Sequence, residues 1–463
     1  MSSSSQNIRH LVIVLGDQLD AESPVLDGFD NRQDILWMAE NHEEATHVWC
    51  HKLRLFFFFS AMRHFAAERG RQNKMPVEYH RLTDQRGKNF AEILEKDIRR
   101  LRPEKILVVE PGDFRVEKLL RHAAKKTNVP LEVLPDTHFY CSKDEFAEWA
   151  DGKKSLLLET FYRHMRKKHR IMMDEGDPRG GEWNFDKENR ESFGSNGPKG
   201  IPPQPTFKLD DTSRDVIDMI EEEFPDHPGS LEHAHLPVTR RDALRALDDF
   251  IDNRLPKFGP FQDAMWTDEA FLYHSRISML LNVKLLNPRE CVDKAIAALD
   301  GNKAPINSVE GFVRQILGWR EFVRGIYFTQ GEEYLDLNEL NHTAPVPQFF
   351  WDGDTDMECM RQAMAQVVDH AYAHHIQRLM VLGLFAQLFG ADPRKFHEWH
   401  LAMYLDAIDW VSAPNTIGMS QYGDGGIVGT KPYCASGNYI NKMSNYCKNC
   451  PYSYKKAHGE NAC

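Results

Sequence analysis

The chain has 463 residues and a mass of 53.6 kDa, and its 41% hydrophobic and 27% charged residues are ordinary for a globular protein of two or three domains. Its net charge of −12, from 57 Lys and Arg against 69 Asp and Glu, argues against broad non-specific binding to nucleic acid, unless a local basic patch overrides it. No apolar run approaches the roughly 20 residues that a bilayer requires, which excludes a membrane-spanning helix.

The start of the chain, MSSSSQNIRH, contains no apolar segment of the kind that a secretion signal needs. The chain also has only eight cysteines. So low a density indicates a reducing cytoplasm, where thiols bind metals and do not form a disulfide framework. We therefore expect a cytoplasmic protein with no membrane partner.

Residues 1–150 alternate between short apolar runs and amphipathic patterns, which is typical of a doubly wound α/β domain with a parallel sheet. Strands are expected at residues 11–15, 46–50, 77–81, 105–109 and 131–134, and helices at 55–69, 89–101 and 115–126. Loops at the carboxyl ends of such strands hold small molecules, and two of them begin at Gly16 and at Glu110. No G-x-G-x-x-G dinucleotide motif follows the first strand.

Residues 151–210 are expected to be a connector with a basic helix and a loop rich in Gly, Pro and Asn over 176–205. The basic run at 163–170 reads most simply as a solvated helix face. From residue 211 to residue 463 strand signals nearly vanish, and a large helical domain is predicted. Its helices are expected at 243–251, 268–281, 309–327, 357–389 and 394–411.

Three cysteines near the end of the chain have metal-ligand spacing, Cys447-x2-Cys450-x12-Cys463. Such thiolates bind zinc or an iron–sulfur cluster, and four thiolates do not by themselves choose the metal. A fourth ligand is expected elsewhere. Spacing alone favours Cys434, which would complete a regular pattern with Cys447.

His370, His374 and Arg378 recur every four residues, so we expect them on one face of the helix over 357–389. His375 would point about 100° away from His374. Adjacent histidines in a helix more often pack or face solvent than act in catalysis. The next expected helix makes a functional site more plausible. It places Asp406 on an apolar stripe, where a buried carboxylate needs a charged partner such as Arg378.

Asp406 belongs to an expected stripe with Trp399, Met403 and Trp410 in the helix over 394–411. Single tryptophans are best interpreted as core packing, whereas several near a buried charge can carry electrons to a redox cofactor. The segment after this helix, 414–426, is rich in Gly, Asn and Ser. That composition indicates close approach of the backbone to a ligand.

Several segments together resemble one family, the iron–sulfur bacterial cryptochromes and photolyases, or prokaryotic (6-4) photolyases. The resemblance runs from residue 16 to residue 463. Its motifs lie at residues 62–65 (MRHF), 160–163 (TFYR), 183–186 (WNFD), 189–190 (NR), 311–324, 371–380, 414–421 and 429–443.

The resemblance implies an α/β antenna domain that holds 6,7-dimethyl-8-ribityllumazine, a helical domain that holds FAD, and a [4Fe–4S] cluster in the C-terminal region. It also implies blue-light repair of pyrimidine (6-4) photoproducts that are flipped out of damaged DNA. A monomeric bacterial protein acting at the nucleoid is expected.

Catalytic roles carried over by the resemblance fall on His374, His375 and Tyr433, with His375 as the expected proton donor. Lesion binding falls on Arg190 and Trp319. Trp399 and Trp351 match the electron route between surface and flavin. FAD contacts are implied for His274, Ser275, Ser278, Asn307, Glu310, Arg314, Gln315, Arg378, Asp406 and Asn415, and antenna contacts for Gly16, Asp17, Gln18 and Glu110.

The resemblance also implies that Cys359, and not Cys434, joins Cys447, Cys450 and Cys463 as the fourth cluster ligand. The chain departs from relatives at His400, where some carry a second aromatic residue. It has Ile316 where classical cyclobutane-dimer photolyases carry Glu, which weakens that alternative. Relatives continue beyond the last ligand, so we expect the native chain to extend past Cys463.

Two further functions stay open from the sequence. One is a cryptochrome-like blue-light sensor with the same cofactors and little repair. The other, from a different class, is a flavin-free iron–sulfur protein that binds nucleic acid and is related to primase large subunits. DNA binding by an acidic chain requires focused positive charge, which we expect from residues 163–170, Arg190 and Lys199.

Overall fold

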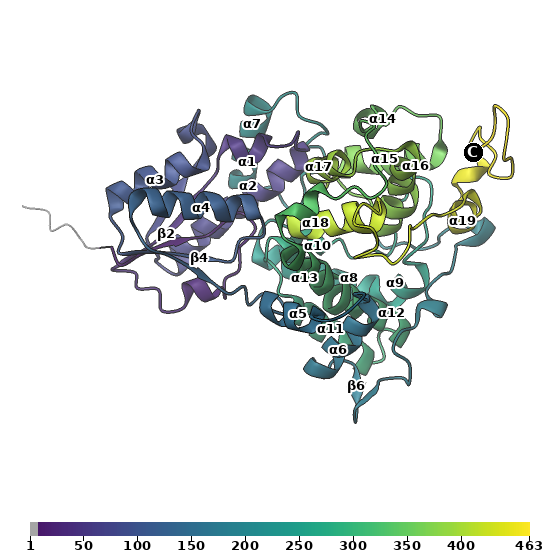
Figure 1. Ribbon diagram of the computed structural model, residues 1–463, viewed down its shortest axis with the longest axis horizontal. Helices are drawn as coiled ribbons and strands as arrows, with labels where there is room; N and C mark the ends of the chain where they lie inside the picture. The colour runs from purple at the N-terminus through teal and green to yellow at the C-terminus, as the bar shows by residue number, and fades with distance from the viewer. Residues whose placement is uncertain (1–7) are drawn as a thin grey trace, which may run out of the picture.

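The computed structural model describes residues 8–463, so the polar start of the chain lies almost wholly outside it. A five-stranded sheet occupies one end of an elongated molecule and a large group of helices the other (Figure 1). The strands are all parallel, in the order β3-β2-β1-β4-β5. They are β1 His10–Ile13, β2 Asp34–Ala39, β3 Val77–His80, β4 Lys105–Val109 and β5 Leu131–Leu134, and a separate antiparallel hairpin pairs β6 Met173–Asp174 with β7 Asp177–Pro178.

Helices that accompany the sheet are α1 His42–Thr46, α2 Lys52–Gln72, α3 Phe90–Leu101 and α4 Phe114–Thr127. We call residues 8–134 the sheet region and residues 135–463 the helical region. The helical region contains α5 Lys143–Ala150, α6 Leu158–His169, α7 Asp211–Glu223, α8 Arg240–Asn253, α9 Leu255–Phe261, α10 Ser278–Asn282, α11 Pro288–Asp300, α12 Ile306–Val313, α13 Glu321–Gln330, α14 Phe349–Asp352, α15 Glu358–His370, α16 Leu384–Phe389, α17 Pro393–Met403, α18 Asp409–Ala413 and α19 Gly437–Met443. It also contains three π-helical segments, η5 Arg314–Arg320, η7 Gln377–Gly383 and η8 Pro414–Ser420.

Alternation along β1 explains how both faces of the sheet are covered. Leu11 and Ile13 pack with α3 and α4 on one face, whereas Val12 and Val14 pack with α2 on the other. A strand buried on both faces reads as a continuous apolar run. The predicted α/β fold class of this part of the chain is confirmed.

The strand predictions at residues 11–15, 77–81, 105–109 and 131–134 are confirmed by β1, β3, β4 and β5. The prediction at 46–50 is wrong. That segment is the end of α1 and a turn, and its apolar side chains Val48 and Cys50 join buried clusters without forming a strand. The missing strand is β2, whose first residue, Asp34, is a buried carboxylate paired with Arg9.

The helix predictions at 243–251 and 309–327 are confirmed by α8 and by the continuous run from α12 through η5 to α13. The helix at 268–281 is wrong, because the segment is irregular up to the short α10 and has left-handed backbone at Asp268, Leu272 and Arg276. The single helix at 357–389 is also wrong. It breaks after α15 at Ala371, whose φ is +49°.

These breaks change which side chains share a surface. His370 and His374 do not lie on one helix face, because the left-handed cap separates them. The helix expected at 394–411 ends at Met403, and a turn that contains Asp406 precedes α18. The expected helical stripe through Asp406 is therefore wrong.

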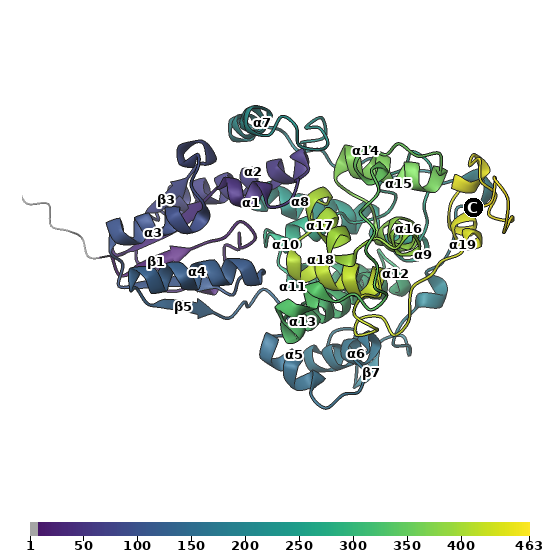
Figure 2. The ribbon, with the colours of Figure 1, turned by 45° about the horizontal axis from the view of Figure 1, so that its top comes forward.

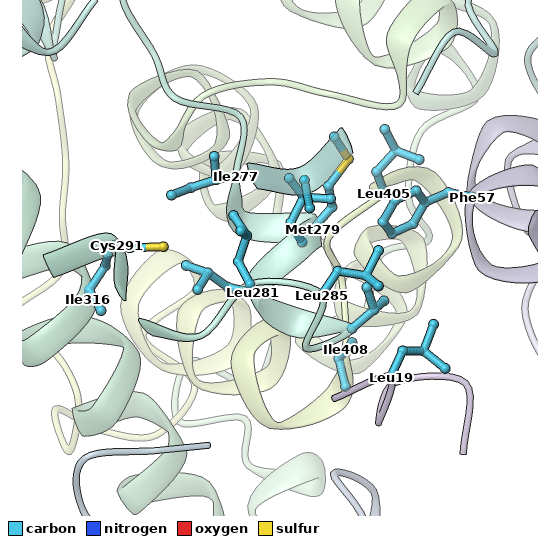
Figure 3. Close-up of a cluster of buried hydrophobic side chains, with 14 of the residues drawn as sticks. Leu19, Phe57, Ile277, Met279, Leu281, Leu285, Cys291, Ile316, Leu405 and Ile408 are labelled. Carbon is cyan, nitrogen blue, oxygen red and sulfur yellow. The ribbon is translucent and has the colours of Figure 1, made fainter. Parts of the chain in front are cut away.

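The two regions pack directly against each other. Figure 3 shows Leu19 and Phe57 of the sheet region beside Leu405 and Ile408 of the helical region, in a cluster of buried side chains. Helix α7 also packs against α2, so a segment from the middle of the chain returns to the sheet region (Figure 2). Within residues 8–463 no helix combines the length and apolarity needed to cross a membrane.

Candidate functional site

A cavity of about 840 Å³ lies inside the helical region. Its walls come from segments far apart in the chain: the irregular stretch at 274–278, the start of the helical run at 373–380, the turn at 406–407, and all three π-helical segments. π-helical turns are rare and occur often at functional sites. Their meeting around one cavity of a size suited to a ligand marks it as the candidate site.

Most of the residues singled out from the sequence meet at this cavity. The structure places the following in its lining: His374, His375, Tyr433, Arg190, Trp319, His274, Ser275, Ser278, Arg314, Gln315, Arg378, Asp406 and Asn415. Glu310 and Asn307 lie behind the wall and are buried. Trp399 and Trp351 also lie outside the lining.

Arg378 and Asp406 form a fixed ion pair on the cavity wall. The guanidinium Nη1 and Nη2 donate to the two carboxylate oxygens at 3.0 and 3.3 Å, and Ser278 Oγ donates to Asp406 at 2.7 Å. Burial by itself would raise the pKa of Asp406, but Arg378 and these hydrogen bonds lower it. The expectation that Asp406 has Arg378 as its partner is confirmed, and the pair presents both charges to a ligand.

Three histidines lie beside this pair: His374 is buried, His274 is half-buried, and His375 is exposed in the wall of the cavity. The rings of His274 and His374 stack with centroids 4.4 Å apart and an interplanar angle of 12°. Among the described residues, His274 Nε2 and both ring nitrogens of His374 have no hydrogen-bond partner. Burial lowers the pKa of His274 and of His375 to about 4, and lowers that of His374 well below its usual value. All three imidazoles are neutral at pH 7, each with one N–H donor and one acceptor nitrogen.

The mouth of the cavity carries Arg190, Asp263, Tyr433 and Tyr439. Arg190 is exposed. Burial raises the pKa of Asp263 to about 6, although nearby Arg190 opposes the shift, and Tyr439 Oη donates to this carboxylate at 3.4 Å. A cation and a carboxylate with a raised pKa thus lie near each other in the lining where a polar ligand would bind.

The basic run at 163–170 is only partly a solvated face. Arg166 is fully buried and donates to the carbonyl oxygens of Trp183 and Ile171, at 3.0 and 3.3 Å, and to that of Met172. The guanidinium carbon of Arg163 lies 5.2 Å from the ring centroid of Trp183, and the ammonium of Lys167 lies 5.3 Å from the same centroid. The expectation of a wholly solvated run is therefore wrong at Arg166.

Trp399 does not line the cavity, and the ring of Tyr404 lies between it and Arg378 of the cavity wall. Arg378 stacks on Tyr404 with its guanidinium carbon 3.9 Å from the ring centroid, and Tyr404 lies 5.5 Å from Trp399, centroid to centroid. Trp399 Nε1 donates to the carbonyl oxygen of Phe350 at 2.8 Å, and Trp351 is the next residue of the chain. His400 lines the cavity itself.

The C-terminal cysteines gather around the start of α15. Burial raises the pKa of the Cys359 thiol to about 12, and the nearness of Cys463, Cys450 and Cys447 adds to the rise. Such interactions between thiolates decay with distance, so the four sulfurs lie together. Cys434 is exposed, and its thiol donates to Gln387 Oε1 at 3.5 Å.

The residues expected to hold an antenna pigment lie where the sheet meets the helical region. Gln18 Nε2 donates to the carbonyl oxygens of Val109 and Glu110 at 3.0 and 3.2 Å, which ties the loop after β1 to the end of β4. Glu110 pairs with Lys143 and Arg324 of the helical region at 3.0 and 3.2 Å. Asp17 is half-buried, and the loss of solvent around its carboxyl raises its pKa. Gly16 lies beside Met62, whose Sδ would be 3.0 Å from an added Cβ.

Sequence reasoning missed several residues of the cavity wall, chiefly Arg276, Tyr372, Asp263 and Tyr439. Arg276 and Tyr372 sit in the two irregular stretches that were expected to be helical. No periodic pattern marks them. The left-handed backbone of Arg276, with φ of +54°, depends on contacts made by distant segments.

The fold is that of photolyases and cryptochromes. It superposes on a bacterial class III photolyase from Agrobacterium tumefaciens with a TM-score of 0.61, covering 94% of this chain and 83% of that one at 14% identity. On the cryptochrome of Synechocystis sp. PCC6803 the TM-score is 0.63, with 96% of this chain and 87% of that one covered, again at 14% identity.

Sequence comparison narrows the class. Residues 12–236 match the family described as deoxyribodipyrimidine photo-lyase-related protein. A (6-4) photolyase of Agrobacterium fabrum is 45% identical over 455 residues, which span 98% of this chain and 89% of the relative. The chain belongs to the bacterial family of (6-4) photolyases and related cryptochromes. Membership of this family implies a flavin cofactor.

Proposed function

We propose that this protein is a DNA (6-4) photolyase that holds FAD in the cavity and uses blue light to repair pyrimidine (6-4) photoproducts. The observation that carries the proposal is the set of neutral, unpartnered histidines beside the Arg378–Asp406 pair, in a chain 45% identical to a (6-4) photolyase. The histidines are placed for proton transfer at a ligand, and the ion pair for orienting a polar heterocycle.

The cavity wall fits a flavin nucleotide chemically. Polar atoms of the wall lack hydrogen-bond partners among the described residues, including His274 Nε2 and both ring nitrogens of His374. Burying such groups unpaired is costly, so a polar ligand that satisfies them is favoured. Arg314, which pairs with Asp186, is suited to a phosphate, and Arg378 with Asp406 to a ring that both donates and accepts hydrogen bonds.

When bound, the flavin supplies the light-driven electron. The chain supplies the proton chemistry. His375 is neutral at pH 7, and its N–H can donate to an oxygen or nitrogen of the lesion as negative charge develops there. A nearby negative charge also raises the pKa of an imidazole, so proton transfer becomes easier at that moment. Tyr433 and Arg190 at the mouth are placed to hold the flipped base and its phosphate.

The decisive experiment is repair of a synthetic (6-4) duplex under blue light by protein that carries flavin. Turnover of the lesion supports the proposal, and flavin-loaded protein with no turnover overturns it. A light sensor would show photoreduction without turnover. Binding to damaged DNA should weaken with salt, because each phosphate contact contributes a slope of about −0.9 in log affinity against log salt.

We further propose that Cys359, Cys447, Cys450 and Cys463 hold a [4Fe–4S] cluster. The thiols of these four residues lie close enough to influence one another electrostatically, and four thiolates are a usual ligand set of such a cluster. Cys359→Ser should abolish the iron and sulfide content of purified protein, whereas Cys434→Ser should leave both unchanged. Iron loss from Cys434→Ser alone would overturn the ligand assignment.

The loop after β1 and Glu110 are proposed to hold 6,7-dimethyl-8-ribityllumazine at the carboxyl edge of the sheet. The placement follows the rule that ligands of parallel sheets bind there. Pigment extracted from the purified protein should show this lumazine. Substitution Gln18→Leu, which releases the loop from β4, should lower the pigment content without removing flavin.

A further inference from the structure

Trp49 is a large aromatic side chain left on the surface. It is 47% exposed and lies in the turn between α1 and α2 of the sheet region. Its ring centroid is 5.2 Å from that of Trp351, with an interplanar angle of 43°. Trp351 is on α14 of the helical region and is half-buried. Two indoles from different regions of the chain thus touch at the surface.

This pair completes a continuous path from the cavity to solvent. Arg378 of the cavity wall stacks on Tyr404, which contacts Trp399. From Trp399 the path crosses the hydrogen bond to the Phe350 carbonyl, at 2.8 Å, and one peptide unit to Trp351. Trp49 is the last ring of this series.

Exposure increases along the path, from 1% at Trp399 to 47% at Trp49. An indole that gives up one electron becomes a cation. A cation is costly in an apolar interior and is stabilised by water at the surface. Water also accepts the indole N–H proton there. The free energy of an electron vacancy therefore falls as the vacancy moves outward.

We propose that Trp49 is the terminal electron donor of this route, an inference that rests on the flavin chemistry proposed above. Trp399 would donate one electron to a photoexcited flavin in the cavity and regain it from Trp351, which would regain it from Trp49. The Trp49 cation releases its N–H proton to water. The resulting neutral radical takes an electron and a proton from a thiol in solution, and two such thiyl radicals combine to a disulfide.

The test locates the radical in the flavin-loaded protein. Protein with oxidised flavin is illuminated with a nitroso spin trap and no thiol, and peptide mass spectrometry then finds the adduct. We expect the adduct at position 49 in the wild type. In Trp49→Phe, which keeps an aromatic ring without an oxidisable indole, the adduct should be lost there and appear at Trp351. Trp49→Tyr should restore trapping at position 49.

Trp149→Phe is the matched control, because Trp149 packs against Phe146 and Phe161 outside this path. Its adduct pattern and its photoreduction by dithiothreitol should equal those of the wild type, whereas photoreduction of Trp49→Phe should be slower. An adduct confined to Trp351 in the wild type, with equal photoreduction of Trp49→Phe, would overturn the role of Trp49. Purified protein without flavin would overturn the proposed function instead.

Discussion

Glu40 at the sheet and His374 beside the cavity are two buried polar groups that differ in their hydrogen bonding. In the sheet region the Glu40 carboxylate accepts hydrogen bonds from Arg63 at 2.7 and 2.9 Å, from Tyr79 Oη at 2.6 Å and from the Leu82 amide at 2.9 Å. Around the cavity, His374 is equally buried, yet neither ring nitrogen has a partner among the described residues. Satisfied groups fix the fold, whereas unsatisfied groups are free for a ligand.

Whether buried polar groups are already paired also distinguishes a structural cluster from a candidate ligand site. Glu78, His80 and Asp97 converge within 4.8 Å, as metal ligands would. Asp97, however, already accepts from Trp37 Nε1 at 2.8 Å and from Arg100 at 2.7 Å, and although burial alone would raise its pKa, hydrogen bonds from His80, Trp37 and Arg100 lower it. We interpret this cluster as structural.

The largest effect, on the repair rate, is expected from His375→Ala, which tests whether the histidines of the cavity act on a ligand. Removal of a proton donor should lower the repair rate about 10²- to 10⁴-fold, while flavin content and the free energy of unfolding change little. Single-turnover repair under saturating light measures this. His122→Ala, on the exposed side of α4, is the control and should repair at the wild-type rate. Equal rates for both variants would contradict the assignment.

Glu40→Gln tests the other side of the contrast. The change leaves Arg63 buried without its carboxylate and should lower the free energy of unfolding by about 3–5 kcal/mol. Denaturant titration measures it. Repair per folded molecule should persist. The exposed pair of Glu222 with Arg86 is the control, because Glu222→Gln should cost only about 0–1 kcal/mol.

Acid should destabilise the protein through histidines that fold into the cavity wall as neutral imidazoles. Burial lowers the pKa of His274 to about 4, against 6.5 for an unperturbed histidine. Between pH 6.5 and 4 the unfolded chain binds a proton at this histidine that the folded chain does not. The free energy of unfolding should therefore fall as pH falls through this window, by about 3 kcal/mol for His274, and stay level above it.

Flavin-free protein titrated with denaturant at pH 7, 6 and 5 would show this dependence. His274→Gln should flatten it, because the variant has no imidazole to titrate at this position. The Glu222→Gln variant should keep the wild-type slope. An unchanged slope in His274→Gln would show that the acid lability does not come from this histidine.

The smallest expected effect is stabilisation by ligand. Flavin bound only to the folded state should raise the free energy of unfolding by about 2.7 kcal/mol at 100 times its dissociation constant. Glu40→Gln should show the same increment from a lower base, because its defect lies outside the cavity. Thermal unfolding with and without FAD measures both, and a smaller increment in Glu40→Gln would show that the two regions are coupled.

Local pattern predicted much of this molecule. Apolar runs predicted four of the five sheet strands. The pairing of Asp406 with Arg378 was predicted because a buried carboxylate requires a cation beside it. The helix breaks at Ala371 and before α18 could not be predicted, because the helical pattern of apolar and polar residues continues through them. Their backbone is fixed by tertiary contacts, such as the amide of Leu405 donating to the Ala371 carbonyl at 3.1 Å.

The cysteines show a different limit. Spacing alone favoured Cys434, whereas the fold brings Cys359 to the other three. A ligand that is distant in the chain leaves no local pattern. Resemblance supplied this residue, and physical reasoning from one sequence would not have done so.

The three π-helical segments have a consequence for how the cavity could change. Each turn of a π-helix holds one residue more than a turn of an α-helix, so each segment is equivalent to a one-residue insertion. Deleting one residue there would let a regular α-helix run on, with the flanking helix faces kept and the side chains of the wide turn moved. The outline of the cavity thus depends on residue count as well as residue type. Substitutions do not change the number of residues in a segment. Single-residue deletions in η5, η7 and η8 would test how that number shapes the cavity.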